Sequence, residues 1–113
     1  MEKFPTPENN EKIEKETVLE ALRTKGPEDP ETKEMVIKWT IQREAEVDKE
    51  NTNRASIIFN IERTDLYLAA GDVEGALEHL EDVLLYASQV KERELYNETL
   101  KKINTIEENK EDK

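Results

Sequence analysis

His79 is the only histidine of the chain, and the acidic residues around it make it the first candidate for chemistry. One helix can present two ligands of a metal ion at positions i and i+3 or i+4, and His79 with Asp82 meets that spacing. Positions 76 and 83 are Ala and Val, however, so the helix supplies no further ligand. We therefore expect His79 to lie at the surface or at the boundary of the core, and we expect no metal and no cofactor.

No catalytic arrangement can be read from the rest of the sequence. The chain contains no Cys, which excludes disulfides, thiol catalysis and Cys-ligated zinc. It contains neither a nucleophile motif nor a glycine-rich phosphate loop. Pairs of carboxylates carry no information in a chain with 28 acidic residues. We predict that the protein is not an enzyme.

Residues 71–90 hold five acidic residues and no Lys or Arg, whereas basic residues are interspersed elsewhere. With about 100° per residue on a helical wheel, four of these acids and one leucine share the face away from the apolar stripe. Like charges at this spacing cost a few tenths of a kcal/mol per pair, so a basic partner that also contacts the leucine would explain the arrangement. The candidate partner-binding residues are Glu74, Glu78, Glu81, Asp82 and Leu85. Two alternatives stay open, a solvated face and a face covered by an N-terminal helix with Lys12 and Lys15.

The net charge is −11, from 17 basic and 28 acidic residues, and it limits the classes of partner that the protein can bind. It argues against direct nucleic-acid binding, which needs a basic stripe, and against adhesion to anionic membranes. The sequence shows neither a signal-peptide apolar segment nor an apolar run of about 18 residues, so we expect a cytoplasmic location. The leading hypothesis is an interaction module whose acidic helix face docks a protein with a basic surface. An acidic inhibitor that mimics nucleic acid and blocks a basic groove is the alternative.

The elements that position these residues are all helical. The chain is 35% hydrophobic and 40% charged, and its apolar residues cluster at helical spacing between residues 13 and 106, with no alternating stretch typical of a strand. We predict an all-α antiparallel bundle of three to five helices, forming a single domain over residues 1–113 with tails at 1–7 and 107–113.

Glycine and proline place the breaks. A first helix is predicted from Thr6 and Pro7 to Gly26, and a second begins at Asp29 and Pro30. Residues 31–70 contain no Gly or Pro. A turn in the polar run 48–54 is one possibility, but the apolar phase continues across that run, so we predict one long helix.

Gly71 and Asp72 form the clearest turn, because Gly ends a helix and Asp caps the next. An amphipathic helix follows from Val73 to Ala87, and a break is expected between residues 88 and 93. We expect residues 73–90 to pack on 54–70 and residues 92–106 to pack on 31–50, with the N-terminal helix over the seam.

The predicted long helix carries two apolar stripes, and we consider a different role for each. Trp39 and Phe59 are expected to be core residues. The second stripe exceeds what one hairpin can bury, so a structural homo-oligomer, such as a homodimer, is a third hypothesis. This stripe consists of Ile37, Ile41, Phe59 and Leu66.

Residues 54–88 contain Tyr67, the pair Gly71 and Asp72, and the pair Ala76 and Leu77. This segment resembles a single tetratricopeptide repeat, a family that has its helix-A tyrosine, its turn and its small helix-B residue at these positions. The family's helix-A Trp and Leu-Gly positions are occupied by other residues, and a step of 34 residues finds no second copy. The resemblance implies a helical hairpin and binding of peptides or proteins.

Overall fold

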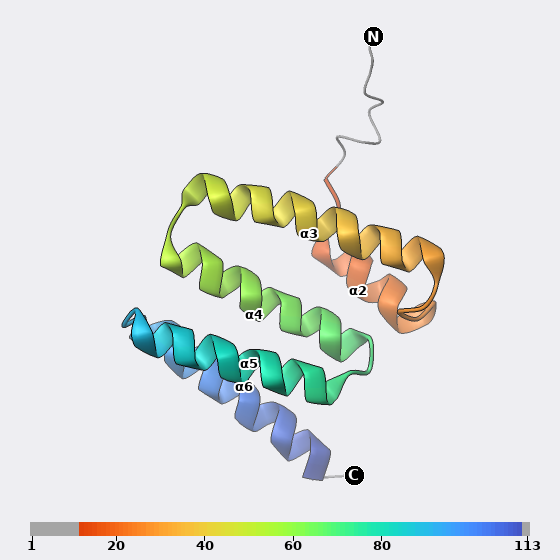
Figure 1. Cartoon of the computed structure of the whole chain (residues 1–113). Helices are drawn as coiled ribbons and strands as arrows, with labels where there is room; N and C mark the ends of the chain where they lie inside the picture. Colours follow the sequence, from red (N-terminus) through yellow and green to blue (C-terminus); the bar gives the residue numbers. More distant parts are fainter. Residues whose placement is uncertain (1–11, 112–113) are drawn as a thin grey trace.

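The computed structural model describes residues 12–111, which form five helices and no strand (Figure 1). The predicted all-α bundle is confirmed. No helix within these residues is both long and apolar enough to span a membrane. The helices are α2 (Lys15–Thr24), α3 (Pro30–Glu50), α4 (Asn53–Ala69), α5 (Val73–Gln89) and α6 (Arg93–Glu111).

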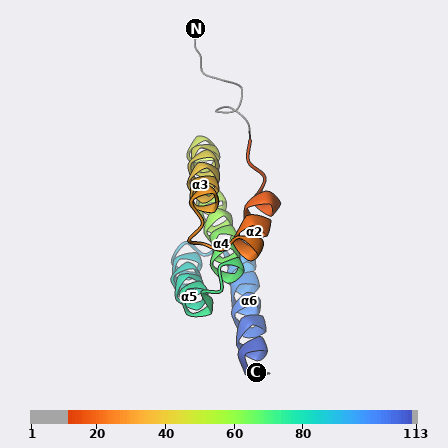
Figure 2. The ribbon, with the colours of Figure 1, turned by 90° about the vertical axis from the view of Figure 1, so that its right-hand side faces the viewer.

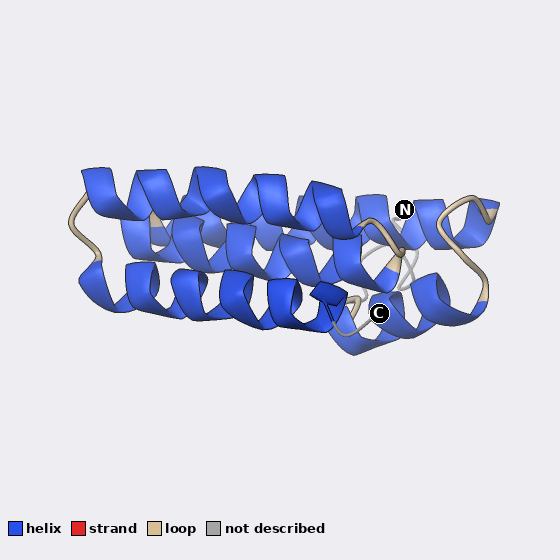
Figure 3. Cartoon of the chain, turned by 90° about the horizontal axis from the view of Figure 1, so that it is seen from below, coloured by secondary structure: helices blue, strands red, loops and turns tan. Residues whose placement is uncertain are grey.

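Helix α4 lies in the middle of the bundle and contacts each of the other four helices. Seen from the side, α3 and α5 lie on one side of α4, and α2 and α6 lie on the other (Figure 2). The helices run nearly parallel to one long axis (Figure 3), and the molecule measures 51 × 35 × 16 Å. It is therefore a flat bundle in which α3 and α5 do not touch.

The predicted packing of α5 on α4 is found, and α2 contacts both α3 and α4. The predicted packing of residues 92–106 on 31–50 is wrong, because α6 packs on α5 and α4 and makes no contact with α3. The reason is the short connection at residues 90–92, where Lys91 adopts a left-handed φ of 64°. This turn folds α6 back against α5, the helix that directly precedes it.

The prediction of one long helix over residues 31–70 is also wrong. Asn51 ends α3 in the left-handed conformation, with φ 56° and ψ 49°, and its N–H donates to the Val47 carbonyl. Thr52 then caps α4, because its Oγ1 accepts a hydrogen bond from the Ala55 N–H at 3.0 Å. Asn tolerates this backbone conformation better than most residues, so a turn without Gly or Pro forms inside the polar run.

This turn allows Trp39 and Phe59 to meet. In one straight helix the two residues would lie about 30 Å apart, but in the α3–α4 hairpin their ring centroids are 5.9 Å apart. Both side chains are buried, as predicted. With Val18, Leu19, Leu22 and Leu66 they form the core between α2, α3 and α4.

Two further clusters fill the other half of the bundle. Ile57, Val83, Ala87 and Leu95 join α4, α5 and α6. Leu77, Leu80, Ile103 and Ile106 join α5 and α6.

Several helix ends follow the predicted capping. The Asp29 carboxylate accepts from the Thr32 N–H at 3.0 Å, and the Asp72 carboxylate accepts from the Gly75 N–H at 2.9 Å. Gly71 has a φ of 85°, the left-handed value that favours glycine. The predicted helical hairpin over residues 54–88 is thus present as α4 and α5.

The two ends of the chain differ from expectation. The predicted start at Thr6 and Pro7 lies outside the described residues, and α2 begins only at Lys15, after non-helical residues 12–14. At the other end α6 continues to Glu111, so residues 107–111, which we expected in a tail, are helical.

The cap at Thr52 gives a first test of this fold. Thr52→Ala removes the acceptor for the Ala55 N–H, and we expect it to lower the free energy of unfolding by about 1 kcal/mol. Urea unfolding followed by circular dichroism measures this change. Thr105→Ala is the matched control, since the exposed Thr105 hydroxyl only donates back to the Lys101 carbonyl and Ala is a good helix former. Equal stability of the two variants would contradict a capped break between α3 and α4.

Candidate functional site

The predicted partner-binding residues all lie on the solvent-exposed side of α5. The side chain of Leu85 is 61% exposed, although leucine is a core residue elsewhere in this helix. Glu78, Glu81 and Asp82 form no ion pair with any other described residue. These three carboxylates and Leu85 therefore form a compact, one-signed surface, which we call the α5 acidic face.

Glu74 differs from the other predicted site residues. Its carboxylate accepts a hydrogen bond from the Lys110 ammonium of α6 at 2.6 Å, and the contact raises the pKa of Lys110 above its ordinary value. Because both side chains are exposed, the pair contributes little stability. Glu74 is thus partly neutralised at the edge where α6 lies.

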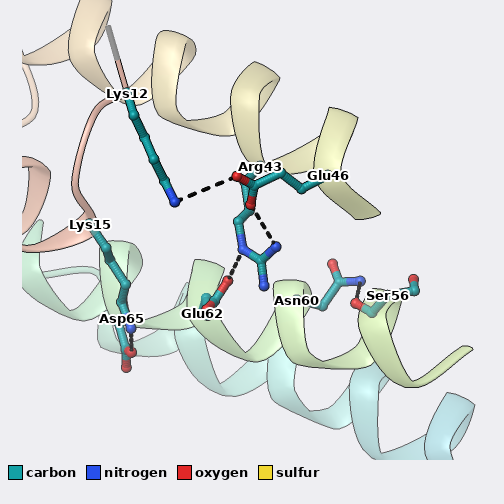
Figure 4. Close-up of polar contacts among 8 residues, drawn as sticks. All are labelled: Lys12, Lys15, Arg43, Glu46, Ser56, Asn60, Glu62 and Asp65. Atoms are coloured by element: carbon teal, nitrogen blue, oxygen red, sulfur yellow. Dashed lines mark hydrogen bonds and ion pairs between the residues drawn. The ribbon is translucent and has the colours of Figure 1, made fainter. Parts of the chain in front are cut away.

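The lysines that could have covered the α5 acidic face lie elsewhere (Figure 4). The Nζ atom of Lys12 lies 3.6 Å from Oε2 of Glu46 in α3, and the Nζ atom of Lys15 lies 2.6 Å from Oδ2 of Asp65 in α4. Helix α2, to which Lys15 belongs, makes no contact with α5. Neither lysine therefore covers the α5 acidic face.

Some carboxylates that lie close to α4 are matched by basic side chains. Arg43 of α3 donates to Glu62 of α4 at 2.7 Å and to Glu46 at 3.0 Å (Figure 4), and these contacts keep its pKa above the ordinary value. The guanidinium of Arg54 in α4 lies 3.6 Å from Oε1 of Glu92, just before α6, and 3.0 Å from Oε1 of Glu94 in α6. These contacts concentrate the unmatched negative charge on the exposed helix faces.

Asp65 forms ion pairs with lysines of two neighbouring helices. Its Oδ2 accepts a hydrogen bond from Lys15 Nζ of α2 at 2.6 Å, and its Oδ1 lies 2.9 Å from Lys102 Nζ of α6. Burial by itself raises the pKa of Asp65, but the hydrogen bonds and charges of the two lysines outweigh burial, so the pKa lies below its ordinary value. Asp65 thus joins α2, α4 and α6 through one side chain.

His79 lies half-buried against α4. Its ring centroid is 5.7 Å from that of Tyr67, and its Nε2 is buried without a hydrogen-bond partner among the described residues. Burial lowers the pKa of His79, and the positive charge of Arg63 lowers it further, against the opposing effects of Asp82 and an Asn60 backbone contact. Within residues 12–111 no three His, Asp or Glu side chains are grouped closely enough to hold a metal ion.

A groove of about 560 Å³ lies between α3 and α4, near the two turns at residues 27–28 and 72. Its apolar walls come from Val36 and Ile37 of α3, from Leu66 and Tyr67 of α4 and from Ala70 just after α4. The groove could not be predicted from the sequence, because in one continuous helix over residues 31–70 these residues could not face each other.

The second apolar stripe is divided by the turn at residues 51–52. Phe59 and Leu66 are buried in the core, whereas Ile37 is 58% exposed and Ile41 is 60% exposed on α3. The Tyr86 hydroxyl of α5 donates a hydrogen bond to Asn53 Oδ1 at the start of α4, at 2.8 Å.

Comparisons of the chain with protein-family models, with curated proteins and with solved structures find no match. The likeness of residues 54–88 to a tetratricopeptide repeat therefore stays a resemblance.

The lowered pKa of Asp65 gives a prediction with a defined pH dependence. A carboxylate whose pKa is lower in the folded state stabilises the fold above its unfolded pKa of about 3.9, and this contribution is lost as the pH falls through the folded value. We expect Asp65→Asn to lower the free energy of unfolding at pH 7 by about 1 to 2 kcal/mol, with a smaller loss at about pH 3.

Urea unfolding of wild type and variant at both pH values measures this difference. Asp48→Asn is the control, because Asp48 is exposed and forms no ion pair among the described residues. A loss in Asp65→Asn that is the same at pH 7 and at pH 3 would attribute the effect to packing and not to charge.

Proposed function

We propose that this protein is a non-enzymatic interaction module that docks a basic protein surface on the α5 acidic face. The observation that carries the proposal is the exposure of Glu78, Glu81 and Asp82 without ion pairs in the described part of the chain, beside the exposed Leu85. An apolar anchor ringed by charges of one sign is an arrangement that interfaces use for orientation and for fast association. The resemblance of α4 and α5 to a repeat that binds peptides or proteins supports the same class, and the cytoplasm is the compartment that we propose.

The layout of charge favours this module over a nucleic-acid mimic. A mimic needs carboxylates along an extended track, whereas Glu62, Asp65 and Glu46 are matched by nearby Arg and Lys side chains. The unmatched acids of α5, Glu78, Glu81 and Asp82, fall instead within little more than about one helical turn. A compact patch with an apolar centre is better suited to a local protein contact.

The test is capture of a partner from a lysate of the native host at low and at moderate salt. The bait is wild type beside a variant with Glu78, Glu81 and Asp82 changed to Lys. The matched control changes Glu98, Glu107 and Glu108 to Lys, which makes the same change in net charge on exposed positions of α6. Raising the salt from about 50 mM to about 300 mM shortens the reach of charge–charge interactions well below 10 Å.

We expect one partner to be held by wild type and by the α6 control, released by salt, and lost from the α5 variant. Leu85→Ser should weaken capture without changing its salt dependence, because it removes apolar area and no charge. Equal capture by the α5 variant and the α6 control would contradict the proposal.

A further inference from the structure

The open side of α4 lies between α3 and α5. Both helices pack on α4 and not on each other, and they lie on the same side of it (Figure 2). The groove of about 560 Å³ opens between α3 and α4, and a helix packed there would lie about 8–10 Å from their axes. On the opposite side of α4, helices α2 and α6 already occupy the corresponding space (Figure 2).

Helix α3 carries two large exposed aliphatic side chains, and one of them lines the groove. Ile37 lines the groove, and Ile41 follows one helical turn later on the same face. Both are more than half exposed, the highest values for large apolar residues of α3. Together with the groove walls of Val36 and Tyr67 they form an apolar strip that no described residue covers.

Unpaired acidic residues lie beside the apolar strip on α3 and on the neighbouring part of α5. On α3, Glu34 and Glu44 lie three residues from Ile37 and Ile41, and Asp48 follows one turn beyond Glu44. All three are exposed and have no ion pair in the described chain. On α5, the exposed and unpaired Asp82 lies about 60° round the helix from His79, which packs on Tyr67 of α4.

Of the basic side chains near the strip, Lys33 is paired, since its Nζ lies 3.4 Å from Glu28 Oε1. The Arg63 guanidinium lies over the Phe59 ring, 5.8 Å from its centroid, and Lys38 lies three residues from Ile41. Both keep their positive charge, without an ion pair in the described chain. The unpaired acids Glu34, Glu44, Asp48 and Asp82 outnumber these two, so the net charge that remains for a partner on this side of the bundle is negative.

From this juxtaposition we propose that the partner presents a basic amphipathic helix, which lies between α3 and α5 with its apolar face on Ile37 and Ile41. The inference rests on the proposed function and extends its site from one helix to two. The apolar stripe of the partner helix covers the strip, and flanking Lys or Arg residues meet Glu44 of α3 and Asp82 of α5. Helix-in-groove recognition of this kind uses anchors at i, i+3, i+4 and i+7.

The experiment uses a synthetic probe, so it does not depend on finding the natural partner. The probe is a labelled Leu/Lys peptide of about 18 residues, five helical turns, with all leucines on one face. A second peptide has the same composition, but its leucines are distributed around the helix. Fluorescence anisotropy measures the Kd of both peptides for the whole chain, and the isoleucine methyl NMR signals report where the peptide lies.

We expect the amphipathic peptide to bind at least about tenfold more tightly than the permuted one. Ile37→Ser and Ile41→Ser should each weaken binding by about threefold to tenfold, which is less than the loss of a fully buried aliphatic side chain. Leu100→Ser is the matched control on α6, where the leucine is 39% exposed, and it should change Kd by less than about twofold. The methyl signals of Ile37 and Ile41 should shift, and the peptide should gain helical circular dichroism.

Five outcomes would overturn the inference. Equal binding of both peptides would mean attraction by charge alone, which leaves the α5 acidic face as a proposal but removes the groove. Unchanged binding by the Ile37 and Ile41 variants, or a bound peptide without helix, would exclude this mode. Absence of binding would exclude it as well. A dimer of wild type that Ile37→Ser dissociates in sedimentation would assign the strip to a second copy of the chain.

Discussion

The structure depends on one constraint, that α4 must pack against four helices at once. Its side chains enter all three hydrophobic clusters, with Phe59 and Leu66 in the first, Ile57 in the second and Leu68 in the third. Because only 35% of the chain is hydrophobic, few apolar residues remain to cover other helix faces once α4 is packed. The bundle is consequently flat, and the outer faces of α3 and α5 stay exposed. The surfaces proposed for binding are thus a consequence of how the core is built.

Charged side chains also differ between the centre and the edges of the bundle. Where helices meet α4, opposite charges are paired, as in Arg43 with Glu62 and in Asp65 with Lys15 and Lys102. The α5 segment has no basic residue of its own, and only Glu74 receives one from a neighbouring helix among the described residues. Like charges on one helix oppose its formation slightly, so the dense burial of the opposite face of α5 must hold it in place. The buried face of α5 therefore stabilises the helix, whereas its exposed acidic face produces the negative potential.

Local signals predicted most of the elements but not all of their boundaries. The turns at Gly26 and at Gly71 with Asp72 were predictable, because a left-handed glycine and a capping carboxylate act within a few residues. The turn at Asn51 and Thr52 was not, since it uses residues that are also compatible with a helix and the apolar phase continues through it. The position of α6 could not be predicted, because its apolar stripe fits α3 as well as α5. The short turn around Lys91 decides between them.

The sequence by itself determined the helical class, the main turns, the burial of Trp39 and the one-signed exposed face of α5, because each depends on spacing along a single helix. Tertiary structure decided what lies beside that face. It separated Phe59 and Leu66 from Ile37 and Ile41, burying the first pair and exposing the second. It also brought α3 and α5 to the same side of α4. These outcomes depend on which helices meet across the α3–α4 turn, and periodicity within a helix carries no information about the direction of the chain after it.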